Sequence, residues 1–428
     1  MSSAIDQAGI RASRRFAAAV RHVPGVAVCS LRCYLRGGAH AEGTPGASAL
    51  AARLLAEGTR RRDWERLAID LERRGMSLST QGAGEAHGVV LDALALDWEQ
   101  ALETVAELVF ESSFEPERFE WQRQQTLAEI ESLADQPEVV AGRAFLEQLY
   151  QPHPAGRSML GDPASLAALD AAECASFHRQ GLDRGVVLVV AGEVDEAVVE
   201  RRIDALFGHL RGEAPASSPL PAPVGLAARR EVEVPARDQA HLYLGHLTVD
   251  RSHPDLAALE VLGVALGTGD GLFGRIPQRV REQEGLAYTV QVGVASGAGS
   301  DAGRLVVYVA TGVATAALAE SAVREELERV AAEGVGAAEV EAARGYLLGR
   351  EPFRRETARQ WADLLAETLF YRIPYDDPQW MRRELERVDV DAVRRAAGRH
   401  IRPDDLKVTL GKPRGRASDV LVSTSPAR

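Results

Sequence analysis

The residues of this chain best suited to chemistry are an arginine and a tyrosine seven positions apart, Arg281 and Tyr288. They lie in the stretch GRIPQRVREQEGLAY, where Pro277 suits the first turn of a helix and Gly285 suits its C-terminal cap. The stretch therefore predicts a helix that ends beside the start of a strand. A guanidinium and a phenol aimed at one point could bind or polarise a peptide carbonyl. On spacing alone, the simpler interpretation is an exposed arginine and a half-buried tyrosine with no shared role.

A glycine-rich segment, GTGDGLFG, immediately precedes this stretch. Its spacing matches the GxGxxG of dinucleotide-binding loops, but that motif must follow a strand. Leucines recur at helical spacing from Leu256 to Leu266, and no GK[ST] is present, so the pattern argues against nucleotide binding. We interpret the segment as a flexible loop between two helices, and its position beside Arg281 favours contact with substrate. The glycines assigned to this substrate-binding role are Gly267, Gly269, Gly271 and Gly274.

A proline-rich segment, GEAPASSPLPAPVG, divides the 428 residues into two similar halves. Its prolines exclude a helix or an inner strand, as is typical of a semi-rigid linker. The predicted domains are therefore residues 1–211 and 226–428, joined by the linker 212–225. Alternating strands such as Val26–Leu35 and Ala240–Leu247 are mixed with helices in a similar order in both halves. The sequence predicts an α+β duplication, in which each half is a mostly antiparallel sheet packed with helices.

Composition and charge narrow the possible partners and compartments. The formal net charge of −12 disfavours binding to nucleic acid or to an anionic membrane surface. No stretch approaches the roughly 18 apolar residues of a membrane span, and the N-terminal segment does not resemble a secretory signal. The three cysteines, Cys29, Cys33 and Cys174, are too few for a disulfide framework and suit a reducing compartment. We expect a cytoplasmic protein that binds neither nucleic acid nor membrane.

The stretch GRIPQRVREQEGLAYTV resembles GRLFQEVREKRGLAYSV of the pitrilysin/insulinase-type (M16) metallopeptidases. Further segments resemble the family in the same order along nearly the whole chain, which makes the match specific. These segments are His153–Pro154 with Gly161–Pro163, Val189–Asp195, Ala240–Gly245 and Ile401–Leu406. The resemblance implies that Arg281 and Tyr288 complete an active site across a cleft, where they bind substrate or stabilise the transition state.

The zinc motif of the family is where this sequence departs from it. The family carries an inverted HxxEH before a Gly-Thr pair; the histidines bind zinc and the glutamate is the general base. Anchored on Gly58–Thr59, the histidine positions hold Ala49 and Arg53, and the glutamate position holds Ala52. Glu129 falls on the third ligand position, where we expect a solvated or salt-bridged carboxylate because a lone glutamate cannot hold zinc.

The resemblance therefore implies a non-catalytic, substrate-binding subunit that pairs with an HxxEH-bearing M16 subunit in a clam-shaped dimer. This chain would hold no cofactor, its partner would hold zinc, and the pair would bind a peptide substrate. An alternative is a structural or peptide-binding M16-like protein without a peptidase role. A third possibility, a homodimeric peptidase with a different metal site, finds no support in any local spacing of histidine, cysteine and carboxylate residues.

Overall fold

The computed structural model describes most of the chain. The described residues are 10–12, 15–210, 212, 220–226, 228–235, 238–269, 274–373 and 379–414. Residues 213–219 of the predicted linker and Gly271 of the glycine-rich segment lie outside these ranges.

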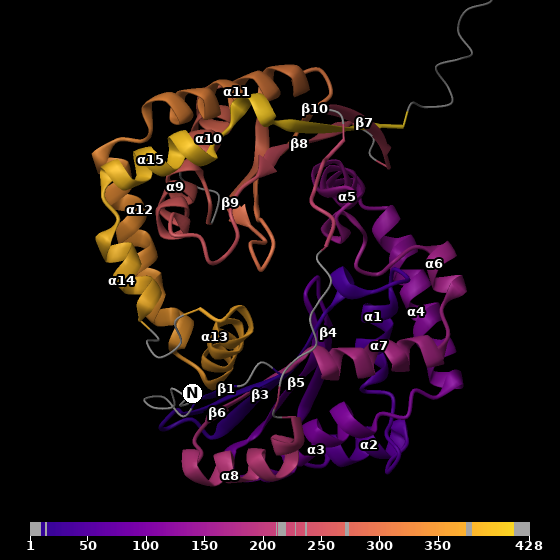
Figure 1. The fold of residues 1–428 in the computed structure, drawn as a ribbon. Coiled ribbons are helices and arrows are strands. Elements are labelled where there is room, and N and C mark those ends of the chain that lie inside the picture. The colour runs from indigo at the N-terminus through magenta and orange to yellow at the C-terminus, as the bar shows by residue number, and fades with distance from the viewer. Residues whose placement is uncertain are drawn as a thin grey trace, which may run out of the picture.

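Two β-sheets organise the described residues, one from each half of the chain (Figure 1). The first sheet has the strand order β1 (Ile10–Ala12), β2 (Phe16–His22), β6 (Val186–Gly192), β3 (Val28–Arg36), β5 (Ala86–Leu94) and β4 (Ser77–Gly82). The second has the order β7 (Arg229–Val234), β11 (Lys407–Pro413), β8 (Gln239–Leu247), β10 (Arg304–Gly312) and β9 (Ala287–Ser296).

The two sheets share one topology. Numbered within its half and leaving β1 aside, each sheet has its strands in the order first, fifth, second, fourth, third. The first and fifth strands are parallel in both sheets, and the remaining neighbours are antiparallel. The predicted α+β fold of two similar halves is confirmed.

Helices fill the connections, and their starts follow ordinary capping chemistry. The side chains of Asp63, Asp170, Asp195 and Asp389 each accept a backbone N–H at a helix start. Among the described residues, no helix combines the length and apolar character needed to cross a membrane. The helices of the first half are α1 (Ala47–Leu54), α2 (Trp64–Glu72), α3 (Trp98–Glu111), α4 (Pro116–Ala134), α5 (Pro137–Tyr150), α6 (Pro163–Ala168), α7 (Ala171–Arg184) and α8 (Glu196–Phe207). Those of the second half are α9 (Leu256–Leu266), α10 (Arg275–Pro277), α11 (Ala316–Glu333), α12 (Ala337–Arg350), α13 (Ala358–Tyr371), α14 (Trp380–Arg387) and α15 (Val390–His400).

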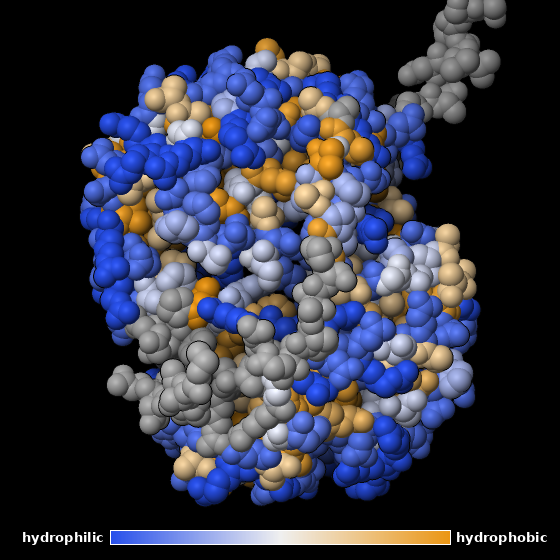
Figure 2. Space-filling model, viewed as in Figure 1, coloured by the Kyte–Doolittle hydropathy of each residue, from blue (hydrophilic) through white to orange (hydrophobic). Residues whose placement is uncertain are grey.

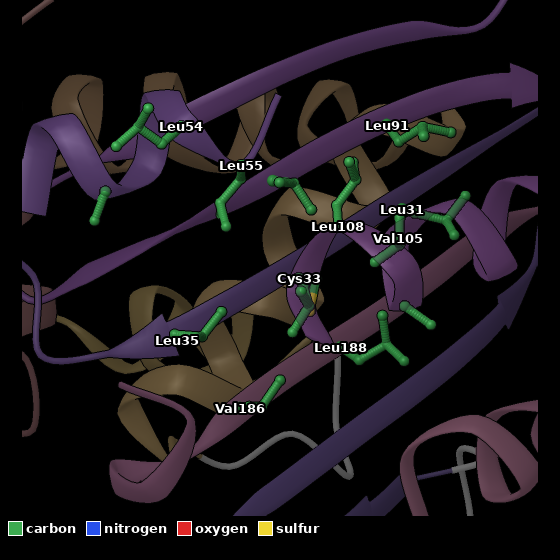
Figure 3. Close-up of a cluster of buried hydrophobic side chains, with 14 of the residues drawn as sticks. Leu31, Cys33, Leu35, Leu54, Leu55, Leu91, Val105, Leu108, Val186 and Leu188 are labelled. Carbon is green, nitrogen blue, oxygen red and sulfur yellow. The ribbon is translucent and has the colours of Figure 1, made fainter. Parts of the chain in front are cut away.

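One face of the first sheet packs against helices of its own half. Figure 3 shows Leu31 and Leu35 of β3 in the same buried cluster as Leu54 of α1 and Leu108 of α3. The second sheet buries an equivalent core against α9, α11 and α15. These clusters cover only one face of each sheet, so each sheet needs a second cover.

Helix α13 of the second half covers the other face of the first sheet (Figure 1). Its Leu365 and Leu369 bury against Val187 and Val189 of β6. A polar contact fixes the helix in place, because the guanidinium of buried Arg32 donates to Asp363 over 2.6 Å.

Helix α5 of the first half covers the second sheet in the same way. Phe145 stacks on Tyr243 of β8 with ring centroids 5.6 Å apart. The buried side chains of Gln148 and Thr409 form a hydrogen bond of 2.6 Å. Leaving 3-10 helices aside, α5 and α13 are each the third helix after the fourth strand of their half. The duplication therefore exchanges one helix in each direction between the halves.

Buried histidines make the stability of this fold depend on pH. Burial lowers the pKa of His178 to about 4, while its Nε2 contacts the Val109 carbonyl oxygen over 2.7 Å. Since the folded pKa lies below the unfolded value of about 6.5, the unfolded chain takes up a proton first on acidification. We expect His178 to contribute a loss of about 2 kcal/mol in the free energy of unfolding between pH 7 and pH 5.

Denaturant unfolding of the chain and of the His178→Gln variant at both pH values tests this expectation. The variant should lose less stability on acidification, whatever its stability at pH 7. The control His209→Gln replaces an exposed histidine and should leave the loss unchanged. An equal loss in the chain and in His178→Gln would contradict the assignment.

Candidate functional site

The segment that carries Arg281 is a helix of mixed type. Helix α10 continues as a π-helix over Gln278–Gln283, where a single α-helix was predicted. Gly285 then adopts a left-handed φ of 62°, and the Leu286 N–H donates to the Val280 carbonyl over 2.8 Å. This turn directs the chain from the helix into β9. π-helical turns are rare and are frequent at functional sites.

Two other arginines of the segment anchor it to neighbouring helices. Arg275 binds both carboxylate oxygens of Glu339 on α12, over 2.6 and 2.7 Å. Arg279 pairs with Glu325 of α11 over 2.5 Å. These ion pairs hold the segment that carries Arg281.

Arg281 itself forms a different kind of ion pair. Its Nε donates to the neighbouring Glu282 over 2.7 Å. The Glu282 side chain is 60% exposed, whereas that of Arg281 is 22% exposed. Arg281 is thus partly buried and pairs with a carboxylate that is accessible to solvent.

Tyr288 lies at an irregularity of the edge strand β9. Ala287 pairs with Thr311 and Thr289 pairs with Ala310, so Tyr288 is the additional residue of a β-bulge. A bulge redirects side chains and is common beside active sites. The Tyr288 side chain is 88% exposed, whereas the simpler interpretation of the sequence expected a half-buried tyrosine.

The described glycines of the preceding loop have structural reasons to be glycine. Gly267, Gly269 and Gly274 have positive φ values of 133°, 126° and 113°. A Cβ on Gly274 would lie 2.4 Å from the Gly267 Cα, and one on Gly267 would lie 2.6 Å from Pro277 Cδ. The two ends of the loop therefore touch each other and the helix that carries Arg281. These contacts explain the glycines, and their substrate-binding role stays a prediction.

The positions aligned with the zinc motif hold an ion pair. Ala49 and Ala52 are buried on α1. The Arg53 guanidinium donates to Thr126 Oγ1 over 2.9 Å and to Glu129 over 2.5 Å, both on α4. The arginine thus places its own positive charge beside the one carboxylate of the set. These residues do not fit a zinc ion, since alanine and arginine side chains offer no ligand atom.

A cavity of about 1350 Å³ lies between the two halves. Figure 2 shows the hollow at the centre of this face. Glu129 is among its lining residues. Arg281 and Tyr288, which the structure describes, are not among the residues that line this cavity. The structure therefore joins Arg53 to Glu129 and places the glycine loop against the helix that carries Arg281, but it does not bring these two groups into one cavity.

The fold also assembles two groups of potential metal ligands that no local spacing reveals. One consists of His40, Glu85 and Asp301, and the other of His253, Asp255 and His400. Within each group, one ligand atom per residue lies within 4.8 Å of the others. Their members come from distant parts of the sequence, so only the tertiary structure identifies them.

The fold consists of two similar α+β halves, and comparisons with known proteins identify its family. Residues 17–163 match the family model Insulinase (Peptidase family M16), and residues 177–347 match Peptidase M16 inactive domain. An uncharacterized zinc protease of Mycobacterium leprae is 30% identical over 378 residues, covering 87% of this chain and 84% of that protein. The chain belongs to the M16 peptidase family, as its sequence motifs predicted.

Two further comparisons match proteins whose names describe a non-peptidase or an inactive domain. A non-peptidase homolog from Helicobacter pylori is 23% identical, covering 85% of this chain and 84% of that protein. The crystal structure of a peptidase M16 inactive domain from Pseudomonas fluorescens superposes with a TM-score of 0.85 at 22% identity. The superposition covers 95% of this chain and 98% of that chain, and it supports the assignment of the fold.

Restoring the missing ligands tests the alignment of α1 with the zinc motif. We expect the triple variant Ala49→His, Ala52→Glu, Arg53→His to bind one more zinc ion per chain than the parent. The two histidines would lie one helical turn apart and face Glu129, which Arg53 now contacts.

Metal analysis of the purified, dialysed proteins provides the measurement. Arg53→His alone is the control and should gain no zinc, because one histidine and one carboxylate make an incomplete site. A folded triple variant with the zinc content of the parent would show that these positions do not face one another as aligned.

Proposed function

We propose that this chain is the non-catalytic, substrate-binding subunit of a heterodimeric zinc-dependent peptidase. One observation carries the proposal: an Arg53–Glu129 ion pair occupies the positions aligned with the zinc ligands, while Tyr288 stands almost fully exposed. A chain that lacks zinc ligands but presents the family's Arg and Tyr is suited to complete another subunit's site.

The division of labour follows from the donors that each subunit has. The HxxEH-bearing partner would supply zinc, its ligands and the general base. Arg281 and Tyr288 would donate N–H and O–H hydrogen bonds to the substrate carbonyl and to the oxyanion that forms from it. The glycine loop at Gly267–Gly274 would contact the peptide beside them.

The position of Tyr288 supports this assignment. A large aromatic side chain that is 88% exposed on an edge strand gains little from its own fold. Burial against a partner or a peptide would give the phenol ring a contact and its hydroxyl group a bonding partner.

An alternative is a structural or peptide-binding role without peptidase activity. The name of the Helicobacter pylori relative as a non-peptidase homolog favours it. The two proposals differ in whether the Arg281 and Tyr288 side chains affect turnover in a partner's site.

We propose that the heterodimer is located in the cytoplasm. The three cysteines are free and buried, and burial raises the pKa of each thiol to about 12. Such thiols stay protonated and behave as small apolar side chains. This state suits a compartment in which no disulfide has to form.

Co-purification tests the proposal directly. We would produce this chain alone, an M16 partner with HxxEH alone, and both together, and measure cleavage of a quenched fluorescent peptide. We expect efficient cleavage only by the pair. Peptide cleavage by this chain alone, or a partner whose activity is the same with and without it, would overturn the assignment.

Within the active pair, we expect Arg281→Ala and Tyr288→Phe each to lower kcat about 10²–10³-fold, because each removes a donor to the oxyanion. Dimer assembly, measured by size-exclusion chromatography, should not change.

Arg382→Ala is the control, since Arg382 also forms an ion pair with a nearby glutamate, Glu386, over 2.9 Å. Its kcat should equal that of the parent pair. Full activity in both Arg281→Ala and Tyr288→Phe would favour the structural alternative.

A further inference from the structure

We propose that His40, Glu85 and Asp301 form a binding site for a divalent transition-metal ion that ties the two halves of the chain together. The site is distinct from the positions aligned with the zinc motif, and it does not depend on a catalytic partner. Its three ligands come from three turns that meet at the wall of the cavity between the halves.

Each ligand is supplied by a separate element. His40 lies in the 3-10 helix Ala39–Ala41, and Glu85 lies in the turn between β4 and β5, both in the first half. Asp301 lies in the turn between β9 and β10 of the second half. A metal ion here would therefore bridge the halves.

The distances suit a common ligand sphere. The potential ligand atoms of all three residues lie within 4.8 Å of one another, and His40 Nδ1 is 3.1 Å from Asp301 Oδ2. Ligand atoms bound tetrahedrally at about 2.1 Å from zinc are about 3.4 Å apart. Small side-chain rotations would bring the three atoms to that spacing. One imidazole and two carboxylates form a mixed N/O donor set, which zinc accepts.

Charge at the site favours a cation. Among the described residues, neither carboxylate has an arginine or lysine within ion-pair distance; the ion pairs of Asp301 are with His40 and His153. Two nearby carboxylates without a strong cationic partner leave a charge that a divalent ion would neutralise.

Glu85 is already held in position by hydrogen bonds. Its Oε1 accepts the backbone N–H groups of Ser300 over 2.8 Å and Asp301 over 3.3 Å, and its Oε2 accepts Ser300 Oγ over 3.3 Å. An ionised carboxylate has about four lone-pair sites, so capacity remains for a metal ion. These bonds order the carboxylate before a metal binds.

His153 gives independent evidence for a built site. Its side chain is only 3% exposed, its Nε2 has no hydrogen-bond partner, and Nε2 lies 3.4 Å from Asp301 Oδ1. The backbone N–H of Ala155 donates to His153 Nδ1 over 3.1 Å. His153 Nε2 is thus a buried polar atom beside the ligand group that lacks a hydrogen-bond partner. In the proposed site His153 is a positioning residue, which would orient the Asp301 carboxylate when a metal ion is bound, as outer-shell groups do in metal sites.

Two glycines keep the site open. A Cβ on Gly84 would lie 2.6 Å from His40 Nε2. A Cβ on Gly299 would lie 2.9 Å from both carboxylate oxygens of Glu85. Each glycine thus leaves room for a ligand side chain in the position that the structure shows.

One histidine of the second group already has a ring nitrogen engaged. The backbone N–H of Asp255 donates to His253 Nδ1 over 3.0 Å. We assign no metal to this group, and it provides a matched control with the same types of donor.

Titration of the untagged, full-length chain alone with ZnCl₂ after treatment with EDTA tests the proposal. Calorimetry should show one zinc ion bound per chain, and saturation should raise Tm by about 3 °C. Asp301→Asn and His40→Gln should each weaken binding at least about 100-fold, and His153→Gln should weaken it about 10–100-fold. Asp255→Asn should bind zinc like the parent.

Each outcome of the titration either supports or overturns the proposed metal site. No stoichiometric binding by the parent, or equal binding by the parent and His40→Gln, overturns the proposal. Loss of binding in Asp255→Asn but not in Asp301→Asn would move the site to the other group and overturn it as well. If Asp301→Asn does not fold, His40→Gln decides, since it keeps a polar side chain of similar size. The test does not measure peptidase activity. A failure of the proposed metal site can therefore be distinguished from a failure of the proposed function.

Discussion

The exchange of one helix between the halves is the packing interaction on which the rest of the structure depends. Each sheet has two apolar faces, and the helices of its own half cover only one of them. The other face of the first sheet is closed by Leu365 and Leu369 of α13, and that of the second by Phe145 of α5. Full burial of one such side chain contributes roughly 1.5–3 kcal/mol. Separation of the halves would expose both faces, so the halves form one structural unit even though the sequence divides them at a linker.

Polar contacts give this exchange its register. Apolar burial alone would allow a helix to slide along a sheet, whereas a buried polar group without a partner costs about 1–3 kcal/mol. Arg32 meets Asp363 and Gln148 meets Thr409 in only one arrangement of helix on sheet. These contacts also determine the shape of the cavity between the halves, because Asp363 and neighbouring residues of α13 form part of its wall. The turns that carry Glu85 and Asp301 meet for the same reason.

Local patterns predicted much of this fold. The duplication and the strand near Ala240–Leu247 follow from periodicity and prolines, which act over a few residues. The destinations of α5 and α13 could not be predicted, since an apolar helix face does not specify which sheet it covers. The bulge at Tyr288 also escaped prediction, because it depends on how β9 pairs with β10. The His40 cluster joins residues that are distant in sequence, so no spacing rule could find it.

The Arg53–Glu129 pair links α1 to α4 at the positions that the sequence aligns with the zinc motif of the family. In a zinc site, the ion would link α1 to α4 and neutralise the carboxylate at position 129. Here the guanidinium supplies a positive charge and also bonds Thr126, so both helices stay joined. Alanines at positions 49 and 52 let α1 pack closely without ligand side chains. The arginine and the two alanines are therefore mutually consistent, since together they join and pack the two helices without a metal ion.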